Sequence, residues 1–314
     1  MHSSKMTTAS QSKASRPAVL LTGASGFLGS SLLRRLLESG RSVIATIRPT
    51  SSRARIADLL AHPNLMLVNS APDSLEDVFQ HRSIGTIIHT ATEYGRGQTP
   101  VVSILDSNLV LPIRLAELGT KYQVRGFINT DSYFNKSRGS YSNLLNYSLS
   151  KRTLLVWLEK FSPQLSIANV VVEHLYGPFD SRPKFVEDII RSIAVERNET
   201  IKLTHGHQKR DFVFLDDVVG AFIKVLEHIE DHDFNFKTFE VGRGEGIPVR
   251  NFVTQVARLS GSPSQLDFGA IDYRDDEIMN SYADIRALLE LGWRPTVGPD
   301  EGIRRILQAY GLGI

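Results

Sequence analysis

The chain has 314 residues, of which 41% are hydrophobic, and this length predicts two closely joined lobes rather than one small domain. Its 36 Lys and Arg residues nearly balance its 34 Asp and Glu residues, which argues against the strongly basic surface that a nucleic-acid partner requires. Because the chain has no cysteine, disulfides, thiolate catalysis and sulfur-ligated metals are excluded.

Residues 1–16 are rich in Ser, Thr, Ala and Lys and hold no apolar segment of the kind found in a secretion signal. No later apolar run approaches the ~18 residues that a membrane span needs. We therefore expect a disordered N-terminal tail over residues 1–16, no membrane partner and a cytoplasmic location.

From residue 19 to residue 172, short β-branched runs alternate with longer helical patterns, which is typical of βαβ units in a parallel sheet. The predicted strands are residues 19–22, 42–47, 65–69, 86–90, 126–130 and 166–172. The predicted helices begin near Phe27, Arg53, Leu75, Val101 and Leu144. This pattern predicts an α/β fold, a doubly wound Rossmann sheet with strand order 3-2-1-4-5-6.

The first predicted strand runs directly into a glycine-rich loop, GASGFLG at residues 23–29, which opens the first helix. Gly23 permits a tight turn, Gly26 lets the backbone approach a pyrophosphate, and Gly29 lets the helix pack closely on the strand. Free N–H groups at the helix start favour an anion. We assign this loop to dinucleotide binding, through Gly23, Ser25, Gly26, Phe27, Leu28 and Gly29.

The end of the second strand predicts which dinucleotide is bound. A carboxylate there would accept hydrogen bonds from a ribose 2'-hydroxyl, but residues 45–53 read ATIRPTSSR and contain none. Arg48 and Arg53, helped by Ser51 or Ser52, can instead pair with a 2'-phosphate. We therefore expect NADP(H) rather than NAD(H), the alternative being that both are ordinary surface arginines.

Tyr147 and Lys151 lie four residues apart, on one face of a predicted helix. A tyrosine exchanges protons poorly at neutral pH unless a nearby cation stabilises its phenolate, and Lys151 is placed to do so. An amphipathic helix would explain this spacing equally well. The preceding strand decides between the two, because it ends in INTDS at residues 128–132 and brings a hydroxyl to the same sheet edge.

After residue 173 the pattern loosens and prolines divide the chain into shorter elements. We expect residues 17–172 to form the Rossmann domain. Residues 173–314 should form mainly a smaller mixed α/β substrate-binding lobe, with segments around 206–235 returning to the Rossmann domain. Ligands of such sheets bind at the carboxyl ends of the strands, so the site should lie between the lobes.

In combination, the GxxGxxG loop, Tyr147 and Lys151 resemble the short-chain dehydrogenase/reductase family, and specifically its extended branch of NAD-dependent epimerases and dehydratases. Further matching motifs are IIHTA at residues 87–91, YGP at 176–178, RDFVFLDD at 210–217 and LGWRP at 291–295. The resemblance covers nearly the whole chain after residue 17.

The resemblance implies roles for further residues. Thr130 takes the position of the catalytic hydroxyl beside Tyr147 and Lys151, and Ser132 is the fallback, since a slip at the strand end would exchange them. Arg210 and Arg274 would hold a substrate diphosphate, with surface salt bridges as the alternative. The remaining implied residues are Thr90, Ala91, Thr92 and Asn108 toward the cofactor, and Glu93, Ser132, His174 and Phe185 toward the substrate.

Three reactions of this family are candidates: dehydration, epimerisation and net reduction of a keto sugar. Dehydratases of this type use an Asp-Glu pair, but here Ser132 follows Asp131, so elimination is not expected. Epimerases usually carry the acidic NAD determinant, whereas the Arg48 region favours a dissociable NADPH and therefore net reduction.

A narrower resemblance, to the CDP-abequose synthase group of nucleotide-sugar 4-ketoreductases, implies reduction of a C4 carbonyl for polysaccharide or O-antigen biosynthesis. Tyr147 would donate a proton, Thr130 would orient the carbonyl oxygen and Lys151 would hold the nicotinamide ribose. The substrate would be a nucleotide-diphosphate sugar. The alternatives are an epimerase with retained NAD(P), a non-catalytic NADP-binding sensor and a scaffold that binds no cofactor.

Two expectations concern assembly and metals. The helices near Val101 and Leu144 resemble those that form a four-helix dimer interface in the family, so we expect a homodimer. His205 and His207 have no third ligand nearby in the sequence, and we assign no metal.

Overall fold

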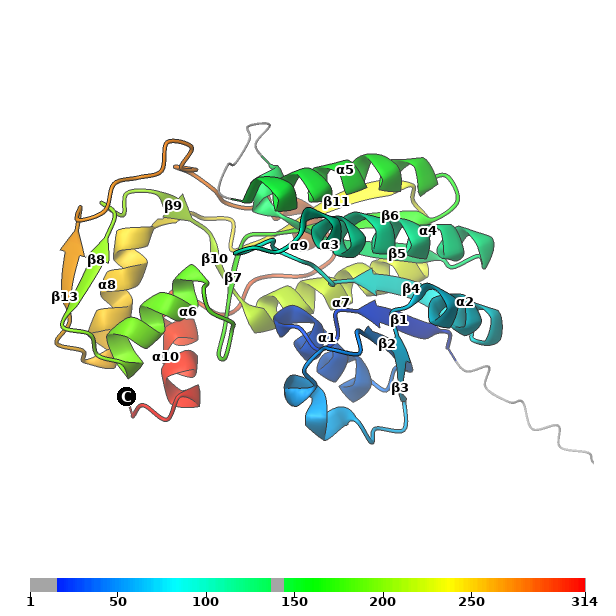
Figure 1. Ribbon diagram of the computed structural model, residues 1–314, viewed down its shortest axis with the longest axis horizontal. Coiled ribbons are helices and arrows are strands. Elements are labelled where there is room, and N and C mark those ends of the chain that lie inside the picture. The colour runs from blue at the N-terminus through cyan, green and yellow to red at the C-terminus, as the bar shows by residue number, and fades with distance from the viewer. Residues whose placement is uncertain (1–15, 137–143, 314) are drawn as a thin grey trace, which may run out of the picture.

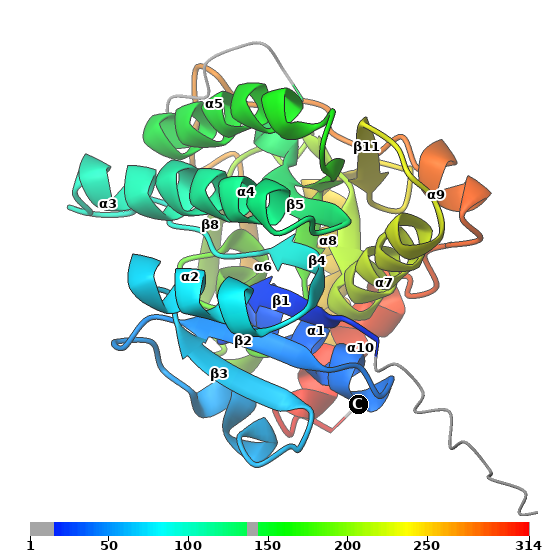
Figure 2. The same cartoon turned by 90° about the vertical axis from the view of Figure 1, so that its right-hand side faces the viewer.

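The computed structural model describes residues 16–136 and 144–313, so the predicted tail lies outside the described residues except for Arg16. A seven-stranded parallel sheet forms its centre (Figure 2). Its strands are β1 (Ala18–Thr22), β2 (Val43–Ile47), β3 (Leu65–Asn69), β4 (Ile84–His89), β5 (Gly126–Ser132), β6 (Ser166–Val172) and β11 (Phe236–Val241). Their order is β11-β6-β5-β4-β1-β2-β3, which confirms the predicted α/β fold and strand order and adds a seventh strand at one edge.

Helices cover both faces of the sheet (Figure 1). On one face lie α1 (Phe27–Glu38) and α7 (Leu215–Asp231), and on the other α2 (Pro72–His81), α4 (Leu111–Lys121) and α5 (Leu145–Phe161). In β1, Leu21 packs toward the first face and Leu20 toward the second, because successive strand residues point to opposite sides. Burial on both faces explains why the inner strands β1 and β2 are almost entirely apolar.

Two shorter helical segments shape the cavity and one surface of the molecule. A 3-10 helix, η1 (Ala54–Leu59), follows β2 where an α-helix was expected to begin near Arg53. α3 (Val101–Leu105) continues through a π-helical turn, η2 (Asp106–Val110), directly into α4.

The second lobe has a hydrophobic core of its own, in which Phe252, Ile303 and Ile193 are completely buried. Its helices are α6 (Phe185–Ile190), continued by the π-helical turn η5 (Arg191–Val195), α8 (Val249–Ser260), α9 (Arg286–Glu290) and α10 (Pro299–Ala309). Its strands are β7 (His174–Tyr176), β8 (Thr200–Leu203), β9 (Lys209–Arg210), β10 (Phe212–Phe214), β12 (Ile247–Pro248) and β13 (Gln265–Phe268). Within α9, Leu288 packs on the sheet side, with the α1 and α7 core.

Among the described residues, no helix combines the length and the apolar character needed to cross a membrane.

Candidate active site

A cavity of about 1240 Å³ lies along the carboxyl ends of the sheet strands and is closed on its other side by the second lobe. Single ligands usually occupy ~300–1,000 Å³, so this cavity has room for a cofactor and a substrate together. The predicted site residues that line it are Gly23, Ser25, Gly26, Phe27, Leu28, Gly29, Arg48, Thr90, Ala91, Thr92, Thr130, Ser132, Tyr147, Lys151, His174, Phe185, Arg210 and Arg274. Arg53, Glu93 and Asn108 do not line it.

The glycine loop at one end of the cavity has no room for side chains. Gly23 has a φ of +69°, and a Cβ there would lie 2.6 Å from the backbone nitrogen of Ala91. A Cβ on Gly29 would lie 2.1 Å from the carbonyl oxygen of Gly23. Helix α1 starts after Gly26, and no side chain caps its first N–H groups. The loop therefore fits a pyrophosphate, which can approach the bare backbone and the helix start.

Beside the glycine loop, the end of β2 presents Arg48, Ser51 and Arg55 to the cavity. Arg53 is exposed at the start of η1 and lies away from the cavity, which corrects its predicted placement. Arg55, two residues further on, takes that place and donates a hydrogen bond of 2.9 Å to the carbonyl oxygen of Phe179 in the second lobe. Arg53 and Arg55 are both visible in the sequence as possible partners of a phosphate. Which of the two faces the cavity depends on how the short 3-10 helix η1 turns, and this cannot be read from the sequence.

Tyr147 is buried in the middle of the cavity wall, with 5% of its surface exposed. Its ring stacks on that of Tyr94, with 5.0 Å between centroids, and Phe134 meets it edge-on. Burial raises the pKa of Tyr147 well above its ordinary value, and the neighbouring Tyr94 adds to the rise, while a hydrogen bond with Ser132 opposes it. The phenol is therefore held in its protonated form at neutral pH.

The structure thus brings Ser132, rather than Thr130, to the phenol. Both residues point to the same side of β5, because alternate strand residues share a face. The Thr130 hydroxyl is buried and has no hydrogen-bond partner among the described residues. Buried hydroxyls are seldom left without a partner, so this oxygen is available to a ligand.

Lys151 is almost fully buried one helical turn after Tyr147, and its ammonium donates a hydrogen bond of 2.8 Å to the carbonyl oxygen of Thr130. Burial lowers its pKa to about 8, against the attraction of Asp131. We expected Lys151 to ease the ionisation of Tyr147. Burial is the largest cause of the raised pKa of the phenol, and the effect of Lys151 on Tyr147 stays a prediction.

Asp131 is engaged in fixed contacts, with its carboxylate directed toward β6. It accepts hydrogen bonds from the backbone N–H of Ser132 at 2.8 Å, from Asn135 at 2.7 Å and from Asn169 at 3.1 Å. Burial raises its pKa. With its oxygens bound in this way, Asp131 is poorly placed to act as an acid on a ligand.

Asn108 lies behind the cavity wall and holds the loop after β4. Its side-chain oxygen accepts hydrogen bonds from the Glu93 N–H at 2.7 Å and the Thr92 hydroxyl at 3.2 Å, and its amide group donates to Ser150 at 3.1 Å. It therefore supports Thr92 and joins this loop to α5. Direct contact with a cofactor, as predicted from the sequence, is not what its position indicates.

The far end of the cavity is lined by His174, Arg210, Arg274 and the acidic Glu277. His174 is half-buried, with its Nε2 3.2 Å from the Tyr133 hydroxyl and its Nδ1 without a partner among the described residues. Burial, together with the positive charge of Arg210, lowers the pKa of His174 well below its ordinary value. Arg210 forms an ion pair with Glu277, a cavity residue that sequence reasoning missed, and Arg274 lies nearby in the lining.

Comparison with known proteins places this site in a family. The model of the NAD dependent epimerase/dehydratase family matches residues 19–242. The chain is 35% identical to the CDP-abequose synthase of Salmonella typhimurium over 301 residues, covering 92% of this chain and 97% of that protein. It is 27% identical to the UDP-glucose 4-epimerase of Mycolicibacterium smegmatis, with 93% and 97% covered.

Solved structures share the whole architecture. A complex of MoeE5 with UDP-glucuronic acid and NAD has a TM-score of 0.78 and 25% identity, covering 94% of this chain and 99% of that one. The dTDP-glucose 4,6-dehydratase of Bacillus anthracis, in complex with NAD, has a TM-score of 0.79 at 18% identity, with 94% and 96% covered. The resemblance predicted from the sequence motifs is thereby confirmed, and the chain belongs to the NAD dependent epimerase/dehydratase family.

Proposed function

We propose that this enzyme uses NADPH to reduce the C4 keto group of a nucleotide-activated 4-keto-6-deoxy or 3,6-dideoxy hexose. The product would be a deoxysugar nucleotide for polysaccharide or O-antigen biosynthesis. The observation that carries the proposal is the position of Tyr147, which lies buried in the cavity wall one helical turn before Lys151, between the glycine loop and the end lined by Arg210 and Arg274. A protonated phenol is what a reductase needs, because the oxygen of the reduced carbonyl must receive a proton.

The residues around Tyr147 fit this chemistry. The cofactor, when bound, supplies the hydride. Tyr147 would donate its proton to the forming alkoxide, and the unpartnered hydroxyl of Thr130 would orient the carbonyl oxygen. Lys151 would hold the nicotinamide ribose, and the glycine loop would bind the pyrophosphate.

The relatives support a nucleotide-sugar substrate. A CDP-abequose synthase and a UDP-glucose 4-epimerase both match over more than 90% of this chain, and the synthase is the more similar of the two. Arg210 and Arg274 line the end of the cavity away from the glycine loop, where a substrate diphosphate would lie. Arginine suits this role, since its guanidinium can bind phosphate oxygens through two hydrogen bonds.

The cofactor we propose is NADP(H). Arg48, Ser51 and Arg55 line the cavity at the end of β2, where a carboxylate would be expected for NAD(H). Two guanidinium groups and a hydroxyl are well suited to a 2'-phosphate, which carries negative charge and several acceptor oxygens.

A second candidate function is epimerisation with retained NAD(P), which the similarity to UDP-glucose 4-epimerase favours. The two functions differ in their consumption of cofactor. A reductase oxidises one NADPH for each sugar, whereas an epimerase regenerates its cofactor in every turnover.

The proposal is tested by incubating the protein with NADPH and a panel of CDP-, dTDP- and GDP-4-keto-6-deoxyhexoses while the nicotinamide absorbance is followed. We expect loss of absorbance with at least one substrate, in proportion to the sugar supplied. The variant Tyr147→Phe should bind NADPH but lose turnover by about 100-fold or more, since it lacks the proton donor. Full turnover in this variant would contradict the assignment of Tyr147 as the proton donor. Absence of oxidation with every substrate would favour epimerisation.

We also propose that the protein is a homodimer formed through a four-helix bundle. One surface carries large apolar side chains that are exposed to solvent, all on α3, η2 and α5. They are Val101, Val102, Leu105, Val110, Leu145, Leu149, Val156 and Trp157, and we call them the helical patch. An apolar patch of this kind is typical of an interface, and a second copy of the same two helices would complete a bundle.

A further inference from the structure

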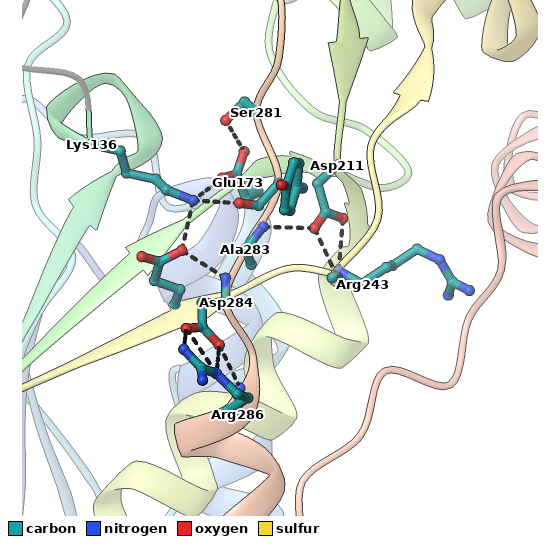
Figure 3. A network of polar contacts seen from close by, with 11 residues as sticks. Lys136, Glu173, Asp211, Arg243, Ser281, Ala283, Asp284 and Arg286 are labelled. Atoms are coloured by element: carbon teal, nitrogen blue, oxygen red, sulfur yellow. Dashed lines mark hydrogen bonds and ion pairs between the residues drawn. The ribbon is translucent and has the colours of Figure 1, made fainter.

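Beside the cavity, a cluster of charged groups joins four parts of the chain that are far apart in the sequence (Figure 3). At its centre is the ammonium of Lys136, the residue directly after η3 (Tyr133–Asn135). It lies 2.9 Å from Glu173, 2.6 Å from Glu240 and 2.5 Å from the carbonyl oxygen of Tyr282. Glu173 is the residue between β6 and β7, Glu240 belongs to β11, and Tyr282 belongs to a segment that leads back from the second lobe.

Glu173 makes this cluster different from an ordinary surface ion pair. Its side chain is 0% exposed, while those of Lys136 and Glu240 are each 25% exposed. Its second carboxylate oxygen accepts a hydrogen bond of 2.7 Å from the Ser281 hydroxyl. An exposed pair contributes little to structure, whereas a buried carboxylate requires its partners, and Lys136 is the cation that Glu173 contacts.

The segment 277–284, which we call the strap, connects this cluster to the substrate end of the cavity. Glu277, at its beginning, pairs with Arg210 inside the cavity. Its later part is fixed by Lys136 and by two backbone N–H groups, those of Ala283 and Asp284. The acceptors are the carboxylates of Asp211, at 3.1 Å, and Glu240, at 2.8 Å.

On its other side, Lys136 is close in sequence to the residues that surround the proton donor. Ser132 contacts Tyr147, and the Phe134 ring meets the Tyr147 ring at 6.3 Å. Tyr133 contacts His174 through its hydroxyl and its ring. Lys136 therefore ends a six-residue stretch, 131–136, that carries one wall of the candidate active site.

From this arrangement we propose that Lys136 is a positioning residue. It ties the end of β5, which surrounds Tyr147, to the strap, which carries Glu277 at the substrate end. The tie fixes the distance between the proton donor and the groups that hold the nucleotide sugar. This inference rests on the proposed function for the roles of Tyr147 and Arg210. A misplacement of about 1 Å between reacting groups can cost about 100-fold in rate, so such a tie has kinetic value.

The test compares Lys136→Met with Lys136→Arg, which keeps the charge, and with a matched control, Lys121→Met. Lys121 forms an exposed ion pair with Glu76 at the end of α4, away from the cavity. For Lys136→Met we expect kcat/KM for the nucleotide sugar to fall by about 10-fold or more, with the Kd of NADPH unchanged. Deuterium exchange at the backbone amides of the strap should become faster. Lys136→Arg should restore most of both properties.

A second variant covers the case in which Lys136→Met fails to fold because Glu173 is left charged and unpaired. Lys136→Met/Glu173→Gln removes the buried carboxylate that Lys136 would have paired with, and the glutamine side chain can still accept the hydrogen bond from Ser281. It should fold and show the same kinetic loss and the same faster exchange.

The outcomes separate this inference from the proposed function. If the wild-type protein reduces none of the sugars, the proposed function fails, and exchange in the strap still decides whether Lys136 holds it. If Lys136→Met and the double variant both behave like Lys121→Met in exchange and kinetics, the tie does not exist. Faster exchange with unchanged kinetics for the sugar would overturn the positioning role.

Discussion

At the scale of single residues, the proposed chemistry depends on two groups whose surroundings shift their pKa values in opposite directions. Burial raises the pKa of Tyr147 and lowers that of Lys151, because it disfavours the charged form of each. The phenol is consequently neutral over the physiological range. Lys151, with a pKa of about 8, is the group of this pair that titrates near neutrality.

This difference predicts how activity depends on pH. Lys151 is charged below its pKa, which burial has lowered from 10.5 to about 8, so its charge is lost as the pH rises through about 8. We expect kcat/KM for NADPH, which reports on the free enzyme, to fall above that pH. The variant Lys151→Met should have a much lower kcat/KM for NADPH, and its kcat/KM should not decline above this pH. A wild-type profile that stays flat up to pH ~10 would contradict the account.

The hydroxyl of Thr130 gives a second prediction, in which activity and stability separate. Replacing an unsatisfied buried hydroxyl by a methyl group of the same shape is neutral or stabilising. Thr130→Val should therefore keep or slightly raise the melting temperature while lowering kcat by about 10-fold to 100-fold, since the orienting hydroxyl is lost. If Thr130→Val kept wild-type turnover, the hydroxyl that orients the carbonyl oxygen would be that of Ser132 and not that of Thr130.

At the scale of elements, our proposal of NADP(H) rests on the turn between β2 and η1. Arg48 and Arg55 line the cavity, whereas Arg53, between them in sequence, is exposed and lies outside it. The three arginines thus form a natural set of two test residues and one control.

We predict that Arg48→Ala and Arg55→Ala each raise the KM for NADPH by about 10-fold and leave the KM for NADH unchanged. The reason is that each removes a charge-assisted hydrogen bond to the 2'-phosphate. Arg53→Ala should leave both KM values unchanged. A loss of NADPH preference in Arg53→Ala alone would show that the turn adopts a different conformation around the cofactor.

Most of the sheet could be predicted from the sequence because its inner strands are buried on both faces and read as apolar runs, and the partly buried strand β3 is apolar as well. Strands 65–69 and 166–172 have the predicted bounds, and the others begin or end within two residues of them. β11 was missed because it is an edge strand in which Lys237 and Glu240 interrupt the apolar pattern.

The candidate site was predicted in its composition but not in its contacts. The motifs place Tyr147, Lys151, Thr130 and Ser132 together, but two residues on the same face of a strand cannot be ranked from their spacing. Arg210 pairs with Glu277, which lies 67 positions later in the sequence, and Lys136 pairs with Glu173, which lies 37 positions later. The sequence contains no local signal for contacts between such distant residues.

At the scale of the whole molecule, the two lobes form one cavity and the helical patch faces away from the fold's own core. Exposed apolar groups on α3, η2 and α5 are costly in water, and pairing with a second copy would bury them.

We predict that light scattering after size exclusion gives twice the chain mass of 35.0 kDa. Val156→Glu, in the helical patch, should yield a folded monomer, because a charge at a buried interface position opposes association. Leu60→Glu changes an exposed apolar residue outside the patch and should remain dimeric. A wild-type monomer at micromolar concentration would rule out the proposed assembly.

The direction of hydride transfer is the central claim, and labelled cofactor measures it most directly. NADPH carrying deuterium at the transferred position of nicotinamide C4 is incubated with the panel of 4-keto sugar nucleotides, and the sugar product is analysed by mass spectrometry and NMR. The account predicts a hydroxyl at sugar C4 with the deuterium bound to the same carbon, and one oxidised cofactor for each product molecule. A product with inverted configuration and unconsumed NADPH, or no product at all, would contradict it.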